Sequence, residues 1–208
     1  MENLLDEINI ASYEIEEQIK DYELEFLSAR DKQVEWRMKF PIFVRSFYSY
    51  VLEYGIIPSQ SEFFQHYVSE NKNSKNIQKL TDHQHEALRA RLYRAYPSYI
   101  RDLHFGKFLT EKGYFDEVVY NVDMDIKDGI DLLVSFGKRK YAINLFTDTS
   151  RAAKARDKKK DRHKEHDYIN IELAISFGGS KCVGKGKYYL YSYRELCELM
   201  GKILRSQV

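Results

Sequence analysis

Three short segments with apolar side chains at every second position constrain the fold of this chain more than any other feature. They span residues 115–122, 130–136 and 140–146. A period of two is typical of β-strands, because successive side chains of a strand point to opposite faces of a sheet. The corner from Gly137 to Lys140 fits a tight hairpin, so the second and third strands are predicted to be antiparallel neighbours. An acidic stretch that favours a turn separates the first two strands and contains Asp123, Asp125, Asp128 and Gly129.

The segments after this hairpin alternate between helix and strand patterns. Residues 147–166 favour a helix, and residues 168–175 favour a fourth strand. A loop rich in Gly and Lys then leads to a short fifth strand at residues 188–191 and a closing helix at residues 193–204. This order predicts an α+β fold in which a mixed β-sheet of about five strands is flanked by helices.

The N-terminal part of the chain is predicted to be all-helical. Residues 2–38 repeat apolar side chains at helical spacing without Gly or Pro, which predicts one or two helices. Residues 42–54 favour a helix closed by Gly55, and Ser59 with Glu62 three positions later forms a capping-box pattern for the next helix. A helix, a short turn and a capped helix are also the beginning of a helix-turn-helix motif.

A polar stretch at residues 71–76 is the best candidate for a linker. We therefore expect a helical N-terminal domain at residues 1–76, with helix-turn-helix as a candidate motif, and an α/β domain at residues 77–208. A helix is expected to resume near residue 82, and Pro97 is expected to break or kink it.

Charge is distributed unevenly, although the formal net charge is only +1. Residues 1–35 are strongly acidic, whereas residues 151–164 are strongly basic. Cations at steps of three and four residues share one face of a helix, and such a stripe can follow a phosphate backbone. The predicted DNA-binding residues are Arg151, Lys154, Arg156, Lys158, Lys159 and Arg162, together with Lys181, Lys185 and Lys187 from the Gly-rich loop.

Two further observations limit the class of protein. No apolar run approaches the roughly 20 residues that a membrane-spanning helix needs, so no membrane partner is expected. Cys182 and Cys197 stand at no metal-binding or disulfide motif spacing, which favours a reducing, cytoplasmic setting.

The C-terminal pattern resembles the core of the PD-(D/E)XK nuclease superfamily. The resemblance rests on a helix, Lys-Gly-Tyr at residues 112–114, a strand, Gly-Ile-Asp-Leu-Leu-Val at residues 129–134, a turn, a strand, a basic segment and a strand. It covers about residues 98–176 and implies a restriction-endonuclease-like core. Carried over by position, Asp131 matches the Asp of the second strand, and Asp102 fits a carboxylate of the preceding helix.

The resemblance also implies a metal-dependent nuclease site. In such a site, carboxylates from adjoining strands hold Mg²⁺, which polarises the phosphate and activates water. Here Asp131 and Asp102 are the implied metal ligands. The third motif departs from the family pattern, because its glutamate position falls on Asn144 and its lysine position on Phe146.

Two interpretations of this departure remain open. In the first, the site has decayed and the fold binds nucleic acid or a protein without cutting. In the second, the lysine function has moved to Lys154 or Lys158, Asp128 or Asp148 supplies charge, and the protein is an Mg²⁺-dependent endonuclease of restriction, repair or mobile-element type. The candidate catalytic residues are then Asp131, Asp102, Asn144 and Lys154. We favour the first interpretation because two defining residues of the third motif are missing together.

A third interpretation comes from another class of protein. The acidic N-terminal region has an apolar stripe that needs a partner, and residues 1–38 are predicted either to pack on the rest of the chain or to form a homodimer or bind another protein.

Overall fold

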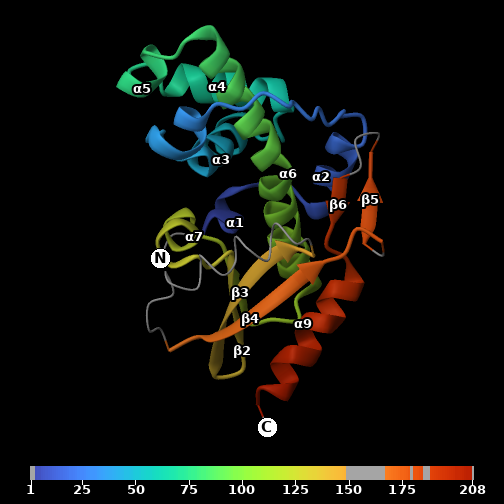
Figure 1. The fold of residues 1–208 in the computed structure, drawn as a ribbon. Helices are drawn as coiled ribbons and strands as arrows, with labels where there is room; N and C mark the ends of the chain where they lie inside the picture. Colours follow the sequence, from blue (N-terminus) through green and yellow to red (C-terminus); the bar gives the residue numbers. More distant parts are fainter. Residues whose placement is uncertain (1–2, 149–166, 179, 185–187, 208) are drawn as a thin grey trace. The chain divides into compact units, whose positions relative to one another are not determined.

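The structure is a computed structural model that describes residues 3–148, 167–178, 180–184 and 188–207 (Figure 1). The described chain is α+β, with a four-stranded mixed sheet, a separate two-stranded sheet and flanking helices. Contacts divide it into two units, and each is described by itself. The sheet unit comprises residues 1–12, 101–182 and 189–208; the helical unit comprises residues 13–100 and 183–188.

The four-stranded sheet organises the sheet unit. Its strands are β1 (Glu117–Val119), β2 (Leu132–Phe136), β3 (Arg139–Thr147) and β4 (Ile169–Ile175). They lie in the order β1-β2-β3-β4; β2 is antiparallel to both neighbours, and β3 and β4 are parallel. The predicted hairpin is confirmed, and Gly137 occupies its turn at φ 63°, a left-handed conformation that favours glycine.

Alternating residues of β2 face two different layers. A Cβ atom on Gly106 of the helix α6 (Asp82–Lys112) would lie 3.3 Å from Leu132 and 2.9 Å from Leu5, so Leu132 faces that helix. The next residue, Leu133, belongs instead to an apolar cluster with Met124 and Ala142. The sheet therefore buries both faces at this point, which accounts for the nearly continuous apolar sequence of β2.

The fifth predicted strand does not extend the four-stranded sheet. Residues Tyr188–Leu190 form β6, which pairs with β5 (Lys181–Val183) in a two-stranded sheet. The expectation of about five strands in one sheet is therefore corrected to four strands plus a separate pair among the described residues.

The acidic turn predicted before β2 is a helix. It is α7 (Val122–Asp128), and the Asn121 side chain caps it by accepting hydrogen bonds from the N–H groups of Asp123 and Met124. Gly129 ends it in the left-handed conformation at φ 72°. The predicted first strand is correspondingly shorter, because the N-cap at Asn121 directs the chain into helix.

Three more helices belong wholly or partly to the sheet unit. They are α1 (Leu4–Glu7), α9 (Tyr193–Arg205) and the C-terminal part of α6 (Asp82–Lys112). The start of α9 is fixed by a capping box between Ser192 and Glu195. Near its end, Lys202 Nζ donates a hydrogen bond of 2.6 Å to the backbone oxygen of Glu172, which holds α9 against β4. The prediction of a closing helix is confirmed.

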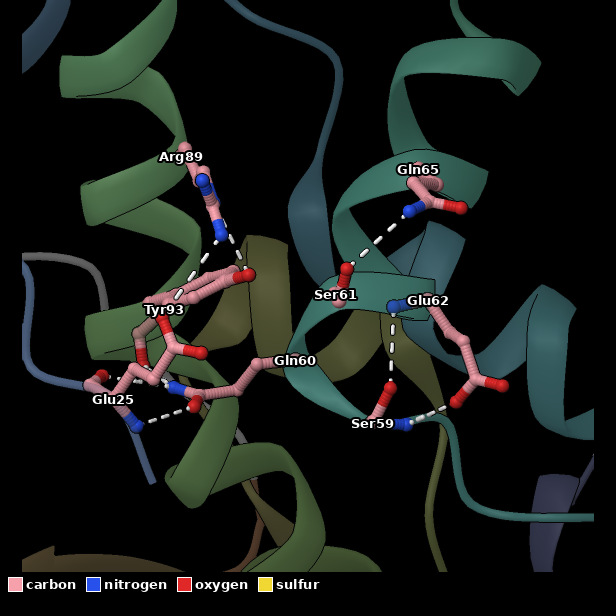
Figure 2. A network of polar contacts seen from close by, with 8 residues as sticks. All are labelled: Glu25, Ser59, Gln60, Ser61, Glu62, Gln65, Arg89 and Tyr93. Carbon is pink, nitrogen blue, oxygen red and sulfur yellow. Dashed lines mark hydrogen bonds and ion pairs between the residues drawn. The ribbon is translucent and has the colours of Figure 1, made fainter. Parts of the chain in front are cut away.

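The helix α6 continues through Pro97, so the predicted break is wrong. Proline has no N–H, and in a helix this leaves the carbonyl oxygen four residues earlier without its usual donor. Here that oxygen belongs to Tyr93, and it accepts a hydrogen bond of 3.1 Å from Nε2 of the buried Gln60 (Figure 2). A side chain from another helix thus replaces the missing backbone donor.

The helical unit contains the remaining helices. They are α2 (Ser12–Ile19), the five-residue π-helix η1 (Gln33–Arg37), α3 (Phe43–Tyr54), α4 (Gln60–Glu70) and α5 (Lys75–Gln78). The end of α3 at Gly55 and the capping box of Ser59 and Glu62 are both confirmed, and Figure 2 shows the reciprocal bonds of that box. Edge-to-face aromatic contacts, such as that of Phe47 with Phe63, hold the helices together.

Residues 2–38 do not form one or two long helices. Only α1, α2 and η1 occur there, and the chain between α2 and η1 has no regular structure. Side chains of other helices bind its backbone instead. Gln60 bonds both backbone groups of Glu25, and Arg94 donates to the oxygen of Ala29. These tertiary bonds replace the helical ones that local propensity would favour.

The structural division differs from the predicted domain boundary. Residue 76 lies inside α5, and the helical unit continues to residue 100. The helix predicted at residues 147–166 cannot begin at Thr147, which is the last residue of β3, and residues 149–166 lie outside the described residues. No helix in the described part of the chain is long and apolar enough to cross a membrane.

Candidate nucleic-acid interface

Asp131 lies directly before β2, and its carboxylate continues the hydrogen bonding of the sheet. Its N–H donates to the Ile143 oxygen at 3.1 Å, and its Oδ2 accepts from the Leu145 N–H at 2.6 Å. In β3, Leu145 is two residues beyond Ile143, so its N–H points to the same side as the Ile143 oxygen, toward β2. Because β2 begins only at Leu132, no strand residue lies there to accept this N–H. The side chain therefore takes the place of a missing strand residue. Asp131 is only 5% exposed.

Asn144 lies in β3 close to Asp131. Asp131 bonds the two residues that flank Asn144, because its N–H donates to the Ile143 oxygen and its Oδ2 accepts from the Leu145 N–H. The Oδ1 atom of Asn144 is buried and has no hydrogen-bond partner among the described residues. The structure thus brings together the second-strand Asp and the residue at the glutamate position of the third motif.

Asp102 lies in α6 and shares an environment with Asp131. Both carboxylates are close enough to the Tyr191 phenol to raise its pKa; burial of the phenol is the largest cause, and the nearby Arg101 guanidinium opposes the increase. The Tyr191 hydroxyl lies 3.3 Å from the backbone oxygens of both Phe146 and Leu173. It therefore joins the ends of β3 and β4 beside the two acids.

Sequence reasoning missed Tyr191 and Arg101. Arg101 is buried, and its Nε donates a hydrogen bond of 2.9 Å to the backbone oxygen of Tyr189. The chain has 17 tyrosines, so nothing in the sequence distinguishes Tyr191 from the others. The signal for Arg101 was its position in the chain directly before Asp102, since a partly buried acid favours a nearby compensating charge.

The described residues do not fit a complete catalytic Mg²⁺ site. They contain no group of three His, Cys, Asp or Glu side chains arranged to hold a metal ion. One oxygen of Asp131 is already bonded to a backbone N–H, and Asn144 brings an oxygen without charge. Mg²⁺ in nuclease-type sites is bound through carboxylates together with substrate phosphate. No catalytic step is therefore assigned to a metal here.

Most of the predicted cationic residues cannot be placed. Lys181 lies in β5, with an exposed residue position. Outside the described residues lie Arg151, Lys154, Arg156, Lys158, Lys159, Arg162, Lys185 and Lys187. Asp148 is the last described residue before the basic segment. Asp148 follows β3, its N–H donates to the Ile175 oxygen at 2.9 Å, and it comes four residues after Asn144.

The pair of helices α3 and α4 gives little to a DNA phosphate backbone. The second helix of a helix-turn-helix motif is the one that enters the major groove. In α4 the sequence QSEFFQHYVSE contains no Lys or Arg and includes two glutamates. Its Phe63, Phe64 and Tyr67 are buried. DNA recognition by these helices stays a prediction, and their packing accounts for the helix-turn-helix pattern.

Comparison of the chain with protein-family models, with curated proteins and with solved structures gives no match in any of the three.

Proposed function

We propose that the protein binds DNA through the basic segment that follows β3, on a PD-(D/E)XK nuclease-like fold whose cleavage site has decayed. The observation that carries the proposal is that Asp131 bonds the two residues flanking Asn144, in the part of β3 from which the chain enters that segment. An acid and an uncharged amide at these neighbouring positions would retain the location of a nuclease site without its charge.

The order of elements supports the nuclease-like part of the proposal. A helix, three antiparallel strands and a fourth strand parallel to the third follow one another, as the family resemblance implies. The chemistry supports the loss of cleavage. Phe146, at the position of the family's lysine, has no group that can stabilise charge on a phosphate.

The test is salt-dependent binding of duplex DNA by two matched variants. Replacing Lys154, Lys158 and Lys159 together by Ala should weaken binding at least tenfold and reduce the slope of log K against log salt by up to about 2.7, because each phosphate contact contributes about 0.9. The control replaces Lys72, Lys75 and Lys79 by Ala, three exposed lysines of the helical unit, and should change affinity less than twofold. Equal losses in both variants would contradict a dedicated interface.

Asp131→Asn separates binding from cleavage. The change removes the carboxylate charge and keeps an oxygen that can accept the Leu145 N–H. Binding should survive, and the parent protein should leave plasmid DNA intact with Mg²⁺ or Mn²⁺. Metal-dependent nicking that disappears in Asp131→Asn would overturn the decayed site in favour of an active endonuclease.

That endonuclease is the second candidate function, and one observation favours it. Asp102 and Asp131 both act on the Tyr191 phenol, so two acids share one small region of the sheet unit. In this alternative Lys154 supplies the missing cation. A Lys154→Ala variant that still binds DNA but no longer cleaves it would support this candidate.

A protein-interaction role for the N-terminal region has less support. Leu5, Ile8, Ile15 and Ile19 are all buried within the chain. Lys107 Nζ also donates hydrogen bonds to the backbone oxygens of Leu5 and Ile8. The first part of the apolar stripe is therefore covered without a second copy, whereas Phe26 is 76% exposed. Dimerisation through the stripe stays a prediction that a measurement of mass in solution would test.

A further inference from the structure

A surface hollow of about 470 Å³ lies in the helical unit between the end of η1 and α6. Its lining includes Met38, Lys39, Phe40, Phe43 and Arg91. The volume falls in the range of small-molecule sites, which is roughly 300–1,000 Å³. Inside it, the Arg91 guanidinium lies 5.1 Å from the centre of the Phe43 ring, a cation–π distance. The hollow thus combines flat aromatic surface with fixed positive charge.

Trp36 lies two residues before Met38, which lines the hollow. It is the only tryptophan of the chain, and it is 80% exposed. A ring with this exposure can be reached by a ligand that also enters the hollow. Trp36 belongs to the π-helix η1, a rare form that is often found at functional sites. We call Trp36 and the lining of the hollow the Trp36 groove.

The backbone that carries Trp36 is held firmly in place. Val34 is fully buried, and its oxygen accepts a hydrogen bond of 2.6 Å from Arg91. Glu35 forms an ion pair with Arg94, so both residues before Trp36 are fixed to α6. Upstream, Gln60 bonds both backbone groups of Glu25, as Figure 2 shows. The ring is therefore displayed by an ordered turn, which reduces the entropy lost on binding.

The charge around the groove is positive. The exposed cations of the same segment are Arg30, Lys32, Arg37 and Lys39. The two acids between them are already engaged. Glu35 pairs with Arg94, and Asp31 accepts hydrogen bonds from the N–H groups of Gln33 and Val34. The four cations still outnumber the two acids of residues 30–39, so an anionic ligand would meet a segment of net positive charge.

We propose that the Trp36 groove binds single-stranded nucleic acid, with a base stacked on Trp36 and the phosphates on the surrounding cations. Aromatic side chains beside a cationic track are the chemistry that recognises single strands, since every base has a π-face and every linkage a negative charge. A second copy of the chain on a twofold axis would bring the same cations face to face. A proline-rich peptide would use the rings and leave the cations unpaired.

Because Trp36 is the only tryptophan, its emission reports directly on this groove. An oligothymidylate of about 12 nucleotides, within the usual site size, should quench that emission saturably. The quenching affinity should fall with salt with a slope of about −2 to −3, for three or four phosphate contacts at roughly 0.7 each. Trp36→Ala should lose binding of the labelled oligonucleotide, and Trp36→Phe should recover part of it by retaining a ring.

Two exposed lysines provide a matched pair of charge reversals. Lys39→Glu, in the groove, should weaken the oligonucleotide at least tenfold, whereas Lys72→Glu, outside its lining, should change affinity less than twofold. Equal weakening would overturn the site in favour of diffuse attraction. The proposal would also fail if no single-stranded oligonucleotide quenched the Trp36 emission, or if a proline-rich peptide quenched it instead. It would fail as well if the emission changed with protein concentration while the mass of the protein in solution doubled, because the groove would then be a dimer interface.

This inference goes beyond the proposed function and does not need it. The protein with Lys154, Lys158 and Lys159 replaced by Ala should still show quenching of Trp36 by oligothymidylate. Conversely, Trp36→Ala should retain binding of duplex DNA through the basic segment. The basic segment and the Trp36 groove are thus tested with different variants and different forms of nucleic acid, so the failure of one proposal can be distinguished from the failure of the other.

Discussion

The end of the four-stranded sheet at Asp131 and the Trp36 groove differ in how their most distinctive residue is placed. The sheet end buries Asp131, whereas the groove exposes Trp36. Asp131 is 5% exposed and bonded to the backbone of β3, so its carboxylate contributes to the sheet itself. Trp36 is 80% exposed, so most of the residue is accessible to solvent. Asp131 occupies the sequence position of a catalytic acid and yet is partly structural, whereas Trp36 belongs to no motif and is accessible to a ligand.

A first way to sharpen the comparison is alkaline pH, where the largest effect is expected. Burial raises the pKa of Tyr67, Tyr96 and Tyr188 in the helical unit and of Tyr191 in the sheet unit. A raised folded-state pKa means that this stability is fully present below the unfolded value of 10.0 and is lost as pH rises above it. Each phenol then costs up to about 1.4 kcal/mol per pH unit.

Urea unfolding between about pH 9 and 11 checks this expectation. The free energy of unfolding should fall by several kcal/mol, with more of the loss in the helical unit, which carries three of the four phenols. Tyr191→Phe should remove the part that belongs to the sheet unit. A free energy that stays constant across this range would contradict the burial of these hydroxyls.

Asp131→Ala tests whether the sheet end is structural. The variant leaves the partly buried Leu145 N–H without its acceptor, which should cost about 1–3 kcal/mol in the free energy of unfolding. Asp131→Asn keeps an acceptor and should cost less. If both variants were as stable as the parent, the carboxylate would have no structural part, and the comparison with Trp36 would fail.

Gln60→Leu tests the support of the helical unit around Pro97. It removes the donor to the Tyr93 oxygen and the bonds to Glu25, with an expected loss of about 1–3 kcal/mol. Gln65→Leu is the matched control, because Gln65 lies on the same helix, is exposed and bonds only Ser61 in Figure 2. Similar losses in both variants would show that α6 passes Pro97 without help from Gln60.

Trp36→Ala should have the smallest effect on stability. An exposed side chain of this kind usually changes the free energy of unfolding by less than about 0.5 kcal/mol. The same variant should lose single-strand binding, so stability and binding should separate completely. A loss of stability comparable with that of Asp131→Ala would mean that Trp36 is a structural residue.

Local patterns predicted the elements whose cause is local. Gly55, the Ser59–Glu62 box and the β2–β3 hairpin depend on residues a few positions apart, and all three are as expected. The continuous α6 was not predictable in this way. Its donor for the Tyr93 oxygen comes from Gln60, which is 33 residues away in the chain.

The same distinction between local and long-range causes applies to the candidate site. Strand order and the β2–β3 hairpin bring Asp131, just before β2, close to Asn144 in β3, and both follow from the alternation of apolar residues. The hydrogen bond of Asp131 to Leu145 depends on exactly where β2 begins, which periodicity does not fix. Trp36 was passed over because a single aromatic in an acidic, helix-like stretch has the same sequence pattern whether it is buried or exposed.

Neither unit is one continuous stretch of chain, and this has a consequence for biosynthesis. The sheet unit draws on residues 1–12, 101–182 and 189–208, and Tyr191 belongs to the last of them. During synthesis on the ribosome, residues 1–12 emerge first, whereas the last segment of the same unit, residues 189–208, emerges only at the end of translation. The sheet unit can therefore complete its fold only then. A fragment that ends before residue 189 would lack the Tyr191 phenol that lies near Asp102 and Asp131.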